Sequence, residues 1–132
     1  MMRFVFDCHG YTDARDDMDQ TLTGVSGRSL MQAVRSGLKR QGYACGPVRD
    51  EDWGWFFRAE RGGRRYLCGG SLEGEGNADA GDTQEASVFI QPERGLADRL
   101  RGLNRPDPDD PACADLRKVL AELPKIEAIV AL

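Results

Sequence analysis

The 132-residue sequence has no long hydrophobic run and little lysine. Crossing a bilayer takes about 20 consecutive apolar residues, so no segment predicts a membrane span. The first apolar stretch meets Asp7 too soon for a signal peptide, and we expect a cytoplasmic protein with no membrane partner. Only Lys39, Lys118 and Lys125 are lysines among 18 basic residues. We attribute this arginine bias to a GC-rich genome rather than to recognition of phosphate or carboxylate groups.

Sequence signatures for metals, nucleotides and catalytic nucleophiles are also missing. No glycine-rich stretch precedes a Lys-Ser/Thr pair, and the aspartates within residues 13–19 lack the glycine and glutamate positions of a calcium-binding EF-hand. The cysteines form no Cys-x-x-Cys pair, so we interpret them as small buried thiols, with two disulfides as the alternative. We therefore expect no metal, no cofactor and no catalytic motif. The cysteines are Cys8, Cys45, Cys68 and Cys113.

The single histidine, His9, follows Cys8 directly, which raises the possibility of a nucleophile or a metal site. Adjacent residues of a strand point to opposite faces, so the two side chains are poorly placed to act together. We interpret the pair as a buried cysteine beside a histidine at the end of a strand.

The formal net charge is −4 and the sequence pI is about 5.0, which disfavours a nucleic-acid binder. An acidic surface can attract a basic protein and then neutralise it. The charge therefore favours a basic protein partner over a nucleic acid.

Alternating and helical hydrophobic patterns predict a single domain over residues 1–132, with a mobile acidic loop at about 73–85. Strands that follow one another, with the helices grouped, predict an α+β fold. We expect a two-layer sandwich on a mainly antiparallel sheet, in the order β-α-β-β-β-β-α-α-β. The expected strands are 3–8, 43–48, 52–61, 64–72, 86–91 and 126–131, and the expected helices are 29–41, 93–103 and 111–123.

Local signals define the ends of two of these helices. Ser29 and Gln32 have the spacing of a capping box, and Gly42 supplies a left-handed stop. Asp110 is a good N-cap and Pro111 a good first residue for the last long helix. A polar loop is expected from His9 to about Gly27, and a stiff linker at 106–111.

Gly62-Gly63 predicts a two-residue hairpin turn, because both positions can take the positive φ that such a turn requires. That turn sets the register: Arg61 opposite Arg64, Trp55 opposite Gly70, and Trp53 opposite Leu72. We expect Trp55 to cover the bare backbone of Gly70. One face of the hairpin is then almost wholly apolar and should lie under the helices. Its members are Trp53, Trp55, Phe57, Ala59, Tyr66, Cys68 and Leu72.

The stretch Glu51-Asp52-Trp53-Gly54-Trp55 resembles a motif of small uncharacterised bacterial proteins. In those proteins a Glu-Asp-x-Gly-Trp element opens a hairpin, and a C-terminal helix and strand follow. The resemblance covers about residues 28–131. It implies a fold and no established activity.

Three functions are compatible with these observations. The first is a non-enzymatic protein-interaction module, immunity-like or regulatory. The second is a small-ligand binder with a pocket between sheet and helices, and the third is a hydrolase-type enzyme that uses Glu51 or Asp52 with His9. The oligomeric state stays open. The candidate residues for binding a ligand or partner are Glu51, Asp52, Trp53, Trp55, Arg58 and Tyr66.

Overall fold

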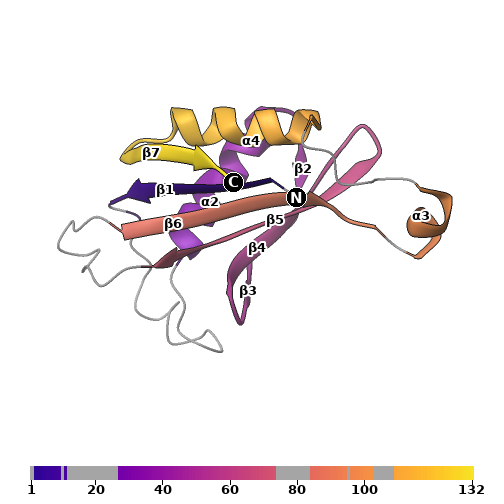
Figure 1. Cartoon of the computed structure of the whole chain (residues 1–132), viewed down its shortest axis with the longest axis horizontal. Helices are drawn as coiled ribbons and strands as arrows, with labels where there is room; N and C mark the ends of the chain where they lie inside the picture. Colours follow the sequence, from indigo (N-terminus) through magenta and orange to yellow (C-terminus); the bar gives the residue numbers. More distant parts are fainter. Residues whose placement is uncertain (1, 10, 12–26, 74–83, 95, 103–108) are drawn as a thin grey trace.

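The computed structural model describes residues 2–9, 11, 27–73, 84–94, 96–102 and 109–132. Over these residues the chain is an α+β fold whose seven strands form one antiparallel sheet, with α2 behind it and α4 along its upper edge in Figure 1. The strands are β1 (Met2–Cys8), β2 (Ala44–Cys45), β3 (Arg49–Glu51), β4 (Gly54–Arg61), β5 (Arg64–Glu73), β6 (Gln84–Pro92) and β7 (Ile126–Ala131). The helices are α2 (Arg28–Arg40), α3 (Leu96–Arg101) and α4 (Pro111–Glu122).

The sheet has the strand order β2-β4-β5-β6-β1-β7, and β3 also pairs with β4. Cys45 of β2 pairs with Ala59, and Asp50 of β3 pairs with Trp55, so β2 and β3 lie one after the other along one edge of β4. The predicted α+β class and antiparallel sheet are confirmed. The predicted element order missed β3, whose three residues are all charged, and the strand expected at 43–48 is reduced to β2 because Pro47 cannot donate a backbone hydrogen bond.

The start of α2 differs from the prediction. Gly27 is the N-cap and no side chain caps the helix, so the capping box at Ser29 is wrong. Gly27 has φ 138°, and its carbonyl oxygen accepts the Met31 N–H at 2.9 Å. A Cβ on Gly27 would lie 3.3 Å from the Cα of Ser71. The close approach of β5 therefore decides where the helix begins.

The end of α2 is as predicted. Gly42 has φ 98°, its N–H donates to the Lys39 carbonyl, and the Tyr43 N–H donates to the Leu38 carbonyl. These two bonds are those of a Schellman motif, which satisfies the last carbonyl groups of a helix.

The β4–β5 hairpin confirms the predicted register from Arg61 opposite Arg64 to Trp55 opposite Gly70. Both turn glycines have positive φ, 60° at Gly62 and 79° at Gly63. The predicted pairing of Trp53 with Leu72 is wrong. β4 begins at Gly54, so Trp53 lies in the turn between β3 and β4 and leaves the face that the helices cover.

The C-terminal half follows the prediction in outline. Asp110 caps α4 by accepting the Ala112 N–H at 3.0 Å, and β7 spans the residues expected for it. α3 is shorter than expected, and its Leu96 and Leu100 are exposed rather than packed. Most of the predicted loops at 9–27 and 73–85, and residues 106–108 of the linker, lie outside the described residues.

The core lies between the sheet and the two long helices. The apolar face predicted for the hairpin is buried there, Trp53 excepted. α2 and α4 approach each other closely at Gly37, where a Cβ would lie 2.4 Å from a methyl group of Val119. The largest fully buried side chains are Phe4, Phe6, Phe57, Leu30, Met31, Leu38, Ile90, Leu116 and Leu120.

Two tyrosine–aspartate pairs attach α4 to the rest of the core. The hydroxyl group of Tyr66 donates to buried Asp110, and that of Tyr43 donates to Asp115 at 2.6 Å. Burial, followed by the neighbouring carboxylate, raises the pKa of Tyr66 to about 12. Arg64 completes the first pair by approaching Asp110 to 2.8 Å. Tyr66 is therefore a structural residue of the core rather than part of a binding surface.

A bulge in β7 gives a testable stabilising change. Two residues of β7, Ala128 and Ile129, lie opposite one residue of β1, and Ala128 has φ 55°. A left-handed conformation costs an ordinary residue about 1–2 kcal/mol, whereas glycine loses roughly 0.5–1 kcal/mol in chain entropy. Ala128→Gly should therefore stabilise the protein by about 0.5–1 kcal/mol, measured as a higher midpoint of urea unfolding. Ala131→Gly, in the same strand without positive φ, should destabilise it; equal effects of the two changes would contradict the bulge.

Candidate functional site

The six residues proposed from the sequence do not form one site. Tyr66 is buried against Asp110, and Trp55 is buried at the start of β4. Arg58 lies on the opposite face of the sheet, where its Nε donates to Glu93 at 2.7 Å. Asp52 and Trp53 form the exposed turn between β3 and β4. These side chains are therefore divided between the two faces of the sheet and its edge.

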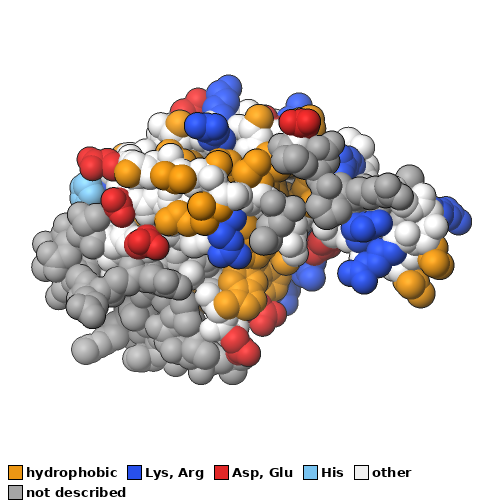
Figure 2. Space-filling view, viewed as in Figure 1, with side chains coloured by type: hydrophobic (Ala, Val, Ile, Leu, Met, Phe, Trp, Pro, Cys, Tyr) orange, Lys and Arg blue, Asp and Glu red, His pale blue; other side chains and the backbone are white. Residues whose placement is uncertain are grey.

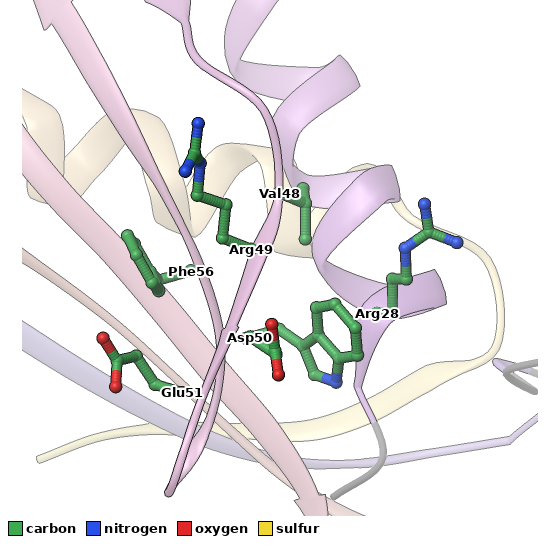
Figure 3. A pocket seen from close by; sticks show the side chains of 7 residues that line it. Arg28, Val48, Arg49, Asp50, Glu51 and Phe56 are labelled. Atoms are coloured by element: carbon green, nitrogen blue, oxygen red, sulfur yellow. The ribbon is translucent and has the colours of Figure 1, made fainter. Parts of the chain in front are cut away.

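Beside β3 the surface is hollowed, with a volume of about 500 Å³. Figure 3 shows Arg28 and Asp50 on one side of β3, and Arg49 and Glu51 on the other. Asp50 pairs with Trp55, and the Arg28 guanidinium lies 5.9 Å from the centre of that indole ring. Strand β3 runs between the two sets of side chains. The hollow is therefore a groove at the edge of the sheet and not one enclosed pocket.

The structure does not bring the predicted acid and base together. Glu51 and Asp52 lie at the β3–β4 end of the sheet, whereas His9 follows β1 and its N–H donates to the Lys125 carbonyl. Strands β5 and β6 lie between β4 and β1. Neighbouring strands are about 4.8 Å apart, so the carboxylates and the imidazole are well beyond the reach of a shared proton.

The cysteines are unpaired thiols, as expected from their scatter. Burial, followed by the charge of Asp7, raises the pKa of Cys8 to about 11. Burial also raises the pKa of Cys68 well above its ordinary range. Thiols in this state are protonated at neutral pH and are weak nucleophiles. We therefore interpret them as core residues.

The face of the sheet opposite the helices carries the most distinctive surface feature, an aromatic cluster. Its ring centroids are 5.3 Å apart for Trp53 and Phe89, and 6.3 Å apart for Trp53 and Phe56. The two phenylalanines are buried, but Trp53 is 44% exposed. We call Trp53, Phe56 and Phe89 the aromatic patch.

A glycine makes room for the exposed indole. A Cβ on Gly69 would lie 2.5 Å from the Trp53 ring, so only a bare backbone lets the indole rest there. The prediction put such a covering at Gly70, under Trp55; the structure has a tryptophan over a strand glycine at Gly69, under Trp53. Gly70 pairs with Trp55 across the hairpin, as predicted. The atoms nearest to a Cβ added at Gly70, however, belong to Ser87, Met31 and Val88.

Two arginines extend the aromatic patch. The guanidinium of Arg3 lies 5.4 Å from the centre of the Phe89 ring and donates to the Ser87 hydroxyl group. The guanidinium of Arg58 lies 5.6 Å from the Phe56 ring and is paired with Glu93. Both guanidinium groups are within the distance of a cation–π contact with their rings. Trp53 is therefore the ring of the patch that is presented to solvent.

A row of carboxylates crosses the same face at one end of the sheet. Asp7 of β1 pairs with Glu85 of β6 on one side and with Glu127 of β7 on the other. Residues directly opposite each other on neighbouring strands point to the same face, and all three are exposed. Figure 2 shows red side chains gathered at this end. We call Asp7, Glu85 and Glu127 the acidic row.

The acidic row is a surface feature and not a chelating site. Over the described ranges, no three His, Cys, Asp or Glu side chains are grouped as metal ligands. Like charges directly opposite each other on neighbouring strands destabilise a sheet. Their cost would be relieved by a positively charged molecule bound over them.

Sequence reasoning missed most of this face. The alternation of side chains along a strand could have located Phe56, Asp7 and Phe89 on the face away from the core. Sequence reasoning could not have paired β1 with β6, because those strands are about 80 residues apart.

Over the described residues, no helix is long and apolar enough to cross a membrane. No protein-family model, curated protein or solved structure matches the chain.

Proposed function

We propose that the chain is a protein-interaction module that binds a basic protein through the face of the sheet opposite the helices. The observation that carries the proposal is an exposed tryptophan, Trp53, on the same face as three adjacent carboxylates. The aromatic patch supplies the apolar contact and the acidic row supplies the charge selectivity.

The aromatic patch has the properties of an interface hot spot. Such residues are most often Trp, Tyr and Arg, and they are rigid and surrounded by groups that exclude water. Trp53 is held by Phe89, Phe56 and the bare backbone of Gly69, so little side-chain freedom is lost when a partner covers it. Burying its remaining exposed surface would then stabilise a complex.

The charges on this face favour a basic partner over an acidic one. The acidic row carries three negative charges in adjacent strands, whereas Arg3 adds one positive charge and Arg58 is paired with Glu93. The net charge of −4 adds a long-range attraction for cations. Such complementarity mainly raises the rate of association and excludes partners of the wrong charge.

Selection of 12-residue peptides from a random display library tests the proposal directly. Peptides enriched on the wild-type protein should carry net positive charge. Their Kd, measured by isothermal titration calorimetry, should rise roughly thirtyfold or more with Trp53→Ala, the loss typical of a hot-spot residue. Glu85→Gln should weaken binding at low salt, and the effect should shrink as salt is added.

The matched control is Glu122→Gln, which removes one exposed carboxylate from α4 on the helical layer. It should leave peptide binding unchanged. Trp53→Phe keeps a ring over Gly69 and should retain part of the affinity. Neutral or acidic selected peptides, or equal binding to wild type and Trp53→Ala, would contradict the proposal. Thermal unfolding of each variant separates a lost contact from a lost fold.

A further inference from the structure

Two leucines of the short helix α3 are largely exposed to solvent. Leu96 is 75% exposed and Leu100 is 79% exposed. Residues four apart lie on the same side of a helix, so the two side chains form one small ridge. Single exposed leucines are normal on natural surfaces, whereas contiguous exposed apolar patches mark interaction sites.

The same helix carries positive charge. Arg99 and Arg101 are both exposed and lie in its last turn, and Asp98 is the only acidic residue of the helix. Figure 1 shows α3 projecting beyond the end of the sheet, and Figure 2 shows blue side chains gathered over it. α3 therefore combines an apolar ridge with a basic flank, which is what the proposed face would bind.

Helix α3 lies beyond one end of β6, and the acidic row lies at the other end of that strand. Glu85, in the acidic row, is the second residue of β6, and α3 begins four residues after β6 ends at Pro92. β6 has 9 residues, which at about 3.4 Å each is roughly 30 Å. Phe89 of the aromatic patch lies between these two ends. Along the strand direction the order is acidic row, aromatic patch, basic helix.

That order is self-complementary under two-fold symmetry. When two copies meet face to face about an axis that runs between the two sheets and crosses β6 on the α3 side of its centre, each strand direction is reversed. The α3 of each copy is then brought to the acidic row of the other, and the two aromatic patches meet near the axis. A two-fold interface of this kind uses the same surface on both copies and closes after two chains.

We infer that this face binds a second copy of the chain, through the basic helix α3 of that copy. Leu96 and Leu100 of one copy extend the apolar contact made by Trp53 of the other, and Arg99 and Arg101 lie against Asp7, Glu85 and Glu127. The inference rests on the proposed function, because it uses the same face and specifies what covers it.

Sedimentation velocity of the full chain over micromolar to millimolar concentrations tests the inference. The wild type should shift from a 14.6 kDa species to one of twice that mass. Leu96→Ser with Leu100→Ser should weaken the dimer at least tenfold. Both leucines are exposed, so the fold should be retained, and circular dichroism checks this.

Charge reversal gives a sharper test of the reciprocal contact. A chain with Glu85→Arg and Glu127→Arg should be monomeric, and so should a chain with Arg99→Glu and Arg101→Glu. A mixture of the two chains should form a heterodimer. The basic α3 of the first chain then meets the acidic face of the second, and the acidic α3 of the second meets the basic face of the first. Glu122→Arg, on α4, is the control and should dimerise as the wild type does.

The outcomes separate this inference from the proposed function. A wild type that stays monomeric at millimolar concentration, a dimer unaffected by the reversals, or an open polymer overturns the dimer. If the chain is monomeric but selected basic peptides still depend on Trp53, the proposed function stands and only the second copy is excluded. If neither binds, both fail.

Discussion

Asp110→Ala is expected to lower the free energy of unfolding by about 3 kcal/mol or more. The carboxylate is buried and accepts the hydroxyl group of Tyr66 at 2.9 Å, the N–H of Ala112 at 3.0 Å and a guanidinium nitrogen of Arg64 at 2.8 Å. Removing one partner of a buried charged network costs about 3–5 kcal/mol, and loss of an N-cap about 1 kcal/mol of that. Because Arg64 is partly exposed, the expected loss of stability lies at the lower end of this range.

Asp110→Asn is the matched variant for this prediction. The amide oxygen can still cap α4, so its loss should be clearly smaller than that of the alanine variant. Urea unfolding followed by circular dichroism gives both values. If the two variants lose the same stability, the negative charge rather than the cap dominates. If alanine costs less than about 1 kcal/mol, the network does not hold α4 to the hairpin.

The same network gives the protein an alkaline limit. The pKa of Tyr66 is raised from 10.0 to about 12, so the folded state favours the protonated phenol. Its contribution is fully present below pH 10 and is lost as the pH rises through 12, where the folded protein must also ionise beside Asp110. In Asp110→Ala this dependence should become weaker but persist, because burial, the larger cause of the raised pKa of Tyr66, remains while the carboxylate is gone.

Gly54→Ala is the second change for which a large loss is expected, about 3 kcal/mol. A Cβ at this position would lie 2.3 Å from the carbonyl oxygen of Gly70, and φ is 156°. Overpacking typically costs about 1–3 kcal/mol and backbone strain adds a similar amount. A backbone carbonyl cannot rotate away as a side chain can, so β3 or β4 has to move. Because Gly54 follows Trp53 directly, binding through the aromatic patch should fall as well.

Gly63→Ala separates the two causes of this loss. Gly63 also has positive φ, at 79°, but no atom lies within 4 Å of its added Cβ. Its expected loss is the backbone cost alone, about 1 kcal/mol. A chemical-denaturation series on both variants measures the difference. Equal losses would mean that the contact between Gly54 and β5 is looser than the structure places it.

Local sequence signals succeeded where one residue and its neighbours decide the outcome. The turn at Gly62-Gly63 and the C-terminal stop at Gly42 follow from glycine's access to positive φ, and the N-cap at Asp110 follows from one side-chain hydrogen bond. The register of β4 on β5 followed from the turn. Each of these features is set within a few residues of the chain.

Local signals failed where a distant segment intervenes. The N-cap of α2 moved from Ser29 to Gly27 because β5 packs against that glycine. The predicted alternation put Trp53 among the core residues, but three residues of β3 pair with β4 and turn the chain back at that position. The candidate site was divided for the same reason, since a shift of one residue moves a side chain to the other face of a sheet.

The sequence by itself determined the α+β class, the antiparallel hairpin and most of the helix and strand positions, because hydrophobic period and turn chemistry act over short distances. Only the tertiary structure decided which strands are neighbours. Pairing β1 with both β6 and β7 places Asp7 between Glu85 and Glu127, and pairing β5 with β6 places Phe89 beneath Trp53. Those contacts join segments far apart in the chain, and no local pattern encodes them.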